Sequence, residues 1–186
     1  MVDALAATDE PARIVELALA PVHDLHATGV AGEYVSVGDD PWFLPAHLEQ
    51  LAEVTAGWWR LTWELPVTDG WIVTPTAYFD FGNGFKEADA VRLREPDAQG
   101  VSETICWIRA PLTHLRLDPT ARRARFRVGP LHMERLTSAE AAEAMRAGVL
   151  TGTYPPSRPE PAIAPPLPPR GAWLDRWRLR LRRGAG

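Results

Sequence analysis

Residues 57–65 read GWWRLTWEL, in which large apolar side chains recur at every second position. Trp59 and Trp63 stand at the odd-numbered positions, and the polar residues Arg60 and Thr62 stand at the even-numbered positions between them. A period of two is typical of a strand that buries one face and leaves the other in water. The stretch therefore predicts a half-buried β-strand.

The same alternation continues from about residue 33 to residue 136. It recurs at residues 73–81, 91–94, 114–118 and 125–128, and Gly, Pro, Asn and Asp separate the runs. The crossover helices that a parallel sheet needs have no room between these runs. We therefore predict an all-β fold, an antiparallel β-sandwich or jelly roll of about seven to nine strands.

The pattern changes after Leu136. Thr137-Ser138-Ala139-Glu140 has the form of a capping box, which predicts a short closing helix that ends before Gly148. Eight prolines between residues 155 and 169 predict an extended linker. The arginines and tryptophans that follow predict a basic amphipathic tail.

These changes divide the chain into four expected parts. They are an N-terminal extension at residues 1–20, a sandwich with its closing helix at 21–150, a proline-rich linker at 151–171 and the tail at 172–186. The whole chain has a formal charge of −4, yet residues 159–186 carry six arginines against two acidic residues. An acidic body thus precedes a basic tail, and we expect no specific binding of nucleic acid.

The start of the chain has no basic segment followed by an apolar run, so no secretory signal is predicted. No stretch reaches the ~18 apolar residues of a membrane span. A cytoplasmic location is expected, with peripheral contact at the inner membrane face as a further option. The single cysteine, Cys106, excludes an internal disulfide.

Motifs of catalysis are missing from the sequence. It has no nucleophile elbow, no zinc-protease motif and no phosphate-binding loop. His23 and His26 are three residues apart but match no standard zinc ligand set, so neither is expected to bind a metal. Cys106 is expected to be a buried, small apolar residue rather than a nucleophile. We therefore predict no catalytic residue, no metal and no cofactor.

Carboxylate pairs leave a glycoside hydrolase as a weaker alternative. Asp80 with Asp118, or Glu64 with Asp80, would supply the acid and the base if the fold brought them together. The separation of the two carboxyl groups would decide the mechanism. Carboxylates on the wet face of a strand are more commonly only solvated.

Aromatic residues carry a stronger functional signal. Trp59, Trp63 and Trp107 are expected in the core, because sandwiches fill the space between their sheets with large side chains. Other aromatic residues would be free to stack on the apolar faces of sugar rings, with polar neighbours binding the hydroxyl groups. The predicted glycan-binding residues are Trp58, Trp71, Tyr78, Asp80 and Asn83.

Four segments together suggest a family. They are Gly57 to Trp63, Ala77 to Glu87, Leu115-Arg116-Leu117-Asp118-Pro119, and Phe126 to Leu131 with Met133-Glu134-Arg135-Leu136. In this order and spacing they resemble an accessory β-sandwich domain found beside catalytic domains in bacterial multidomain glycosyltransferases of surface-polysaccharide synthesis. The resemblance covers about residues 30–137.

The resemblance implies a non-catalytic, jelly-roll-like module that holds a glycan or positions a transferase domain, and it transfers no catalytic residue. A nucleotide-sugar transferase domain does not follow the linker, so a stand-alone relative or a truncated member is expected. An alternative is a protein-interaction module that its tail recruits to a membrane or to a partner transferase. The tail residues expected to make that contact are Trp173, Arg176, Trp177 and Arg180.

Overall fold

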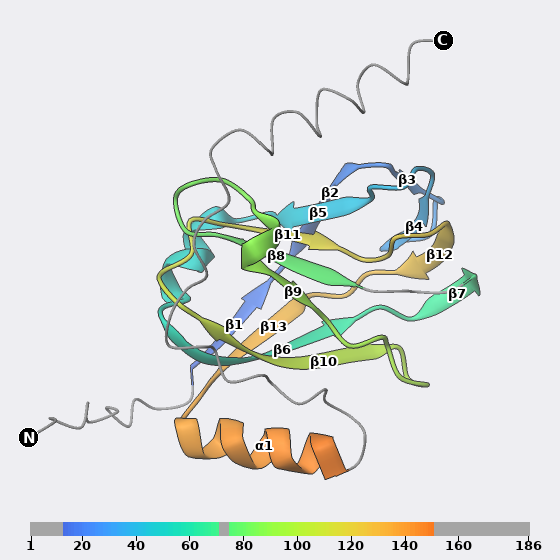
Figure 1. The fold of residues 1–186 in the computed structure, drawn as a ribbon. Helices are drawn as coiled ribbons and strands as arrows, with labels where there is room; N and C mark the ends of the chain where they lie inside the picture. The colour runs from blue at the N-terminus through green and yellow to red at the C-terminus, as the bar shows by residue number, and fades with distance from the viewer. Residues whose placement is uncertain (1–12, 71–74, 151–186) are drawn as a thin grey trace, which may run out of the picture. The chain divides into compact units, whose positions relative to one another are not determined.

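A computed structural model describes residues 13–70 and 75–150, which form thirteen strands in three antiparallel sheets (Figure 1). Sheet A has the order β1-β13-β6-β10, with β1 at Ile14–Leu17, β13 at Leu131–Leu136, β6 at Gly57–Glu64 and β10 at Val101–Ile108. Sheet B has the order β2-β5-β11-β8-β9, with β2 at Leu19–His23, β5 at Trp42–Pro45, β11 at His114–Asp118, β8 at Thr76–Asp80 and β9 at Ala90–Arg92. Sheet C has the order β3-β4-β12-β7, with β3 at Leu25–Ala27, β4 at Glu33–Ser36, β12 at Ala124–Arg127 and β7 at Val67–Gly70. The predicted class, an all-β sandwich, is confirmed.

The strands in the described ranges outnumber the seven to nine that the sequence predicts. Many of the extra strands are only three to five residues long, too short to show a clear period of two. The sandwich also begins before residue 21, where the sequence analysis places its start. Val15 and Leu17 on β1 are buried in the core, and β1 pairs with β13. Residues 14–20 therefore belong to the sheets rather than to an extension.

Sheets A and B enclose the main core. The alternation in β6 places Trp59 and Trp63 on the inner face, and both are completely buried. Phe43 on β5 meets Trp63 edge to face, with 6.3 Å between the ring centroids. One apolar cluster includes these three rings and the inner residues of β8 and β11, so the two sheets share a single core. Their outer faces consequently point to opposite sides of the sandwich.

A helix covers one end of the outer face of sheet A. α1, at Ser138–Leu150, packs Ala141 against Ile105 and Leu136. The capping box is confirmed, because Glu140 accepts hydrogen bonds from the amide and the hydroxyl of Thr137, and the Thr137 hydroxyl accepts one from the Glu140 amide. The helix continues through Gly148 instead of ending before it.

Two short 3₁₀ helices, η1 at Leu48–Glu53 and η2 at Glu87–Asp89, complete the described elements. The linker and the tail lie outside the described residues, and so do the tail's four predicted contact residues, Trp173, Arg176, Trp177 and Arg180. Among the helices that the structure describes, none has the length and apolar character needed to cross a membrane.

Candidate functional site

The predicted glycan-binding residues do not gather at one place. Tyr78 and Asp80 lie on β8 in sheet B, and Asn83 is exposed in the loop that follows. Trp58 lies on the outer face of sheet A, where it packs beside α1. The fold thus brings together Tyr78, Asp80 and Asn83 and places Trp58 on the opposite side of the sandwich. Trp71 lies outside the described residues.

Of the three tryptophans expected in the core, Trp59 and Trp63 are confirmed there. The prediction for Trp107 is wrong, because this residue is 46% exposed. β10 is an edge strand, and its inner face carries Cys106 and Ile108 instead. Trp107 therefore points outward, where it meets Trp58 edge to face at 5.3 Å between centroids.

The outer face of sheet B carries a row of stacked side chains that crosses four neighbouring strands. We call His23 on β2, Trp42 on β5, Arg116 on β11 and Tyr78 on β8 the aromatic row. His23 stacks on Trp42 with 6.2 Å between centroids and 18° between ring planes. The Arg116 guanidinium carbon lies 5.1 Å from the centroid of Trp42 and 5.1 Å from that of Tyr78, within cation–π range of both rings.

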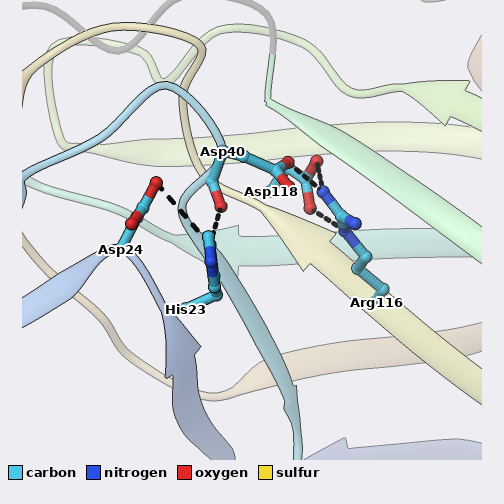
Figure 2. A network of polar contacts seen from close by, with 5 residues as sticks. All are labelled: His23, Asp24, Asp40, Arg116 and Asp118. Atoms are coloured by element: carbon cyan, nitrogen blue, oxygen red, sulfur yellow. Dashed lines mark hydrogen bonds and ion pairs between the residues drawn. The ribbon is translucent and has the colours of Figure 1, made fainter. Parts of the chain in front are cut away.

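Carboxylates hold the centre of this row in place (Figure 2). Asp118 binds Arg116 through both oxygens, with Nε–Oδ1 at 2.6 Å and Nη2–Oδ2 at 2.8 Å, and Asp40 accepts a further hydrogen bond from Nη2. His23 is anchored by the backbone carbonyl of Asp40, 3.0 Å from its Nδ1, and lies 3.6 Å from a carboxylate oxygen of Asp24. A carbonyl only accepts, so this contact places a proton on Nδ1.

Burial and neighbouring charges shift the pKa values of Arg116 and Tyr78 in the row and of Asp118 beside it. Burial opposes the charged form of Arg116, but the hydrogen bonds and charges of Asp118 and Asp40 outweigh it and raise the pKa of Arg116. Burial, together with the negative charges of Asp40 and Glu87, raises the pKa of Asp118 even though Arg116 lowers it. Burial, followed by the charge of Asp118, raises the pKa of Tyr78. At neutral pH the row therefore offers a fixed guanidinium cation and a protonated phenol.

Asp80 organises the loop after β8. Its Oδ1 accepts hydrogen bonds from the amides of Gly82, Asn83 and Gly84 at 2.8, 2.9 and 2.8 Å, and its Oδ2 lies 3.0 Å from Nδ1 of His114. Burial would raise the pKa of Asp80, but these hydrogen bonds together lower it. Asp80 is consequently ionised at neutral pH, and its contacts fix the loop that carries Asn83.

The carboxylate pairs that suggest a hydrolase are not arranged for that chemistry. Glu64 lies on sheet A and Asp80 on sheet B, so the sandwich separates them. Asp80 pairs with His114 and Asp118 pairs with Thr76, which puts the two aspartates at opposite ends of the β8–β11 ladder. Four residues of strand amount to roughly 13 Å. Glycosidases hold their carboxyl groups about 5 to 10 Å apart.

Cys106 lies in the core, as the sequence predicts. Burial raises the pKa of its thiol to about 12. The thiolate is the reactive form, so alkylation of the native protein at pH 8 is expected to be on the order of a thousandfold slower than alkylation of the urea-unfolded chain. Iodoacetamide labelling followed by mass spectrometry measures both rates. Equal rates would show that Cys106 is accessible in the native fold.

Within residues 13–70 and 75–150, no set of three or more His, Cys, Asp or Glu residues is arranged to hold a metal ion. The acidic side chains of Figure 2 are directed at Arg116 and His23 instead.

Comparison with known proteins leaves the chain without a match. No family model, curated protein or solved structure matches it. The fold and the site define its class by themselves: an all-β sandwich with an aromatic row, fixed by carboxylates, on the outer face of one sheet.

Sequence reasoning missed three members of that row, His23, Trp42 and Arg116. Alternation places Arg116 and Tyr78 on wet faces, but it does not reveal that β11 lies between β5 and β8. One local feature of the sequence points to the row. Trp42 directly follows Asp39-Asp40-Pro41, and this segment places Asp40 within hydrogen-bond distance of Arg116.

Proposed function

We propose that this sandwich is a non-catalytic module that binds a glycan on the aromatic row of sheet B. The observation that carries the proposal is the row itself, in which two aromatic rings flank a fixed guanidinium on a solvent-facing sheet. Its association with bacterial glycosyltransferases of surface-polysaccharide synthesis rests on the motif resemblance of residues 30–137.

The core does not require these side chains. Phe43, Phe79 and Leu117 fill the inner faces of β5, β8 and β11 and are almost completely buried. Trp42 and Tyr78 alternate with them and face outward, each partly exposed. Large aromatic side chains that add little to the core are suited to contact a ligand.

Tyr78 supplies the stacking surface. One face of its ring is directed at Arg116, whereas its partner on the other side is Ala90 of β9, whose side chain is a single methyl group. Trp42 already contacts His23 and Arg116, which lie on the two strands that flank β5, so Trp42 acts by holding the row in place.

Polar groups around the row match sugar hydroxyls. The side chain of Asp40 is 51% exposed and that of His114 is 43% exposed, so each retains capacity for further hydrogen bonds. Asp40 contacts Arg116, and His114 lies two residues before Arg116 on β11, so both are on the same face as Tyr78. An aromatic ring accompanied by hydrogen-bonding groups is the usual chemistry of a sugar site.

The test is a calorimetric titration of the full chain with a panel of bacterial polysaccharide fragments. We expect saturable binding to one glycan class, weakened about tenfold or more in Tyr78→Ala and less in Tyr78→Phe, which keeps the ring. Trp107→Ala is the matched control, because it removes an exposed tryptophan from the other sheet. Its affinity should equal that of the wild type.

Unchanged binding in Tyr78→Ala would place the ligand elsewhere and contradict the proposed site. If no glycan binds, the scaffolding role becomes the better proposal, in which the module positions a partner transferase domain. Circular dichroism and thermal unfolding of each variant confirm that any loss of binding occurs in folded protein.

A further inference from the structure

Sheet C, at one end of the sandwich in Figure 1, carries a concentration of positive charge. Arg125 and Arg127 lie on β12 and alternate with the buried Phe126, so both point outward. Arg122 and Arg123 lie in the turn immediately before that strand. All four side chains are exposed, although the chain as a whole has a net negative charge.

The guanidinium N–H donors of these four arginines have no partner among the described residues. In the part of the chain that the structure describes, none of them forms an ion pair or a side-chain hydrogen bond, in contrast to Arg60 and Arg116, which carboxylates hold. Asp69 lies opposite Arg125 in register, yet the two form no ion pair.

Glu33, directly opposite Arg127 in register, is engaged elsewhere. Its two oxygens accept hydrogen bonds from the hydroxyls of Thr28 at 2.6 Å and Thr68 at 3.3 Å, and the residue is only 7% exposed. The hydrogen bond from Thr28 lowers the pKa of Glu33 most, and Arg125 and Arg127 lower it further. The threonine hydroxyls orient the Glu33 carboxylate, so it attracts Arg125 and Arg127 only through its charge and forms no hydrogen-bonded ion pair with either. The guanidinium N–H donors of both arginines stay available to an external anion.

Aliphatic side chains lie beside the charge. Val35 is directly opposite Arg125 and shares its face, and Val37 follows two residues later and is 43% exposed. Val30, in the turn between β3 and β4, is 48% exposed. A nucleic acid or a free phosphate gains nothing from exposed valines, whereas a lipid surface accepts both the arginines and the valines.

We propose that the outer face of sheet C binds an anionic lipid surface, with Arg125 and Arg127 contacting headgroup phosphates and Val37 contacting the acyl boundary. Guanidinium groups recognise phosphate oxygens in a bidentate manner, which suits two arginines that alternate along one strand. The inference is independent of the glycan site, since it concerns a different sheet and a different ligand.

Sedimentation of the full chain with vesicles tests this inference. The protein is expected to bind phosphatidylcholine vesicles that contain phosphatidylglycerol, to ignore vesicles of phosphatidylcholine alone, and to dissociate as the salt concentration rises. The double variant Arg125→Gln/Arg127→Gln should reduce partitioning about tenfold or more. The tail is present in every variant, so differences between variants report on sheet C.

The matched control is Arg92→Gln/Arg146→Gln, which removes the same charge from exposed arginines on β9 and α1. Equal losses in the two double variants would overturn the proposal, because they would reflect net charge alone. A third measurement tests the apolar contact by sedimenting Val37→Ser with the same vesicles, and reduced vesicle binding supports the lipid surface. Duplex DNA is titrated in parallel into the wild type and into Arg125→Gln/Arg127→Gln. Unchanged vesicle binding of Val37→Ser, together with tight DNA binding that the arginine variant loses, would overturn the lipid proposal in favour of a general phosphate site.

Discussion

Replacing Trp63 by alanine should lower the free energy of unfolding by about 3–5 kcal/mol, the largest loss that we expect for any single core substitution. Trp63 is completely buried between sheets A and B and packs edge to face on Phe43. The space left by an indole would not collapse without shifting both sheets. Urea denaturation followed by circular dichroism should show a lower midpoint with an unchanged slope.

A matched pair of conservative variants separates packing from hydrogen bonding at this position. Trp59 and Trp63 lie on the same face of β6, and both are fully buried. Nε1 of Trp59 donates to the carbonyl of Thr55 at 2.9 Å, whereas Nε1 of Trp63 has no hydrogen-bond partner within the described residues.

Phenylalanine at position 59 therefore leaves a carbonyl without its partner, whereas at position 63 it removes a buried donor that is already unsatisfied. We expect Trp63→Phe to cost about 1 kcal/mol less than Trp59→Phe. Equal costs, or a larger cost at position 63, would mean that the Trp63 indole has a hydrogen-bond partner in solution.

The sequence predicts well those features that depend on local spacing. Alternation in residues 57–65 assigns Trp59 and Trp63 to the buried face because successive side chains on a strand point to opposite sides. The capping box is equally local, since Thr137 and Glu140 lie only three positions apart and form both hydrogen bonds.

The aromatic row, the candidate binding site, depends on contacts between residues far apart in the sequence, which no local pattern predicts. Arg116 contacts Trp42 and Asp40, which precede it by more than seventy residues, only because β11 lies between β5 and β8. Alternation likewise shows that Trp58 and Tyr78 point outward, but it does not show that they point to opposite sides of the sandwich. Strand order decides both, and strand order follows from the global packing of the sheets.

Asp80→Ala should cost roughly 2–3 kcal/mol of unfolding free energy, the second large effect that the structure predicts. One carboxylate satisfies three consecutive loop amides and contacts His114, and its side chain is only 9% exposed. Alanine leaves those donors without an acceptor inside the fold. Asp97→Ala is a suitable control. Asp97 accepts hydrogen bonds from the amides of Gln99 and Val101 in an exposed position, so its replacement should cost less.

The pH dependence of Asp80 distinguishes its charge from its shape. Its pKa in the folded protein lies below the ordinary value of 3.8, so its carboxylate stabilises the fold above that value. This contribution is lost as the pH falls through the folded pKa. An asparagine side chain at this position would keep an oxygen acceptor for the amides but not the charge. We therefore expect Asp80→Asn to be roughly 1 kcal/mol less stable than the wild type near pH 6.

Below about pH 4 the difference between Asp80→Asn and the wild type should diminish, because protonation then removes the charge from the wild-type side chain as well. Urea denaturation of both proteins from about pH 3 to pH 6 measures it. A stability difference that grows toward acid pH would mean that the pKa of Asp80 is raised in the folded protein instead of lowered. Burial would then outweigh the hydrogen bonds from the loop amides and His114.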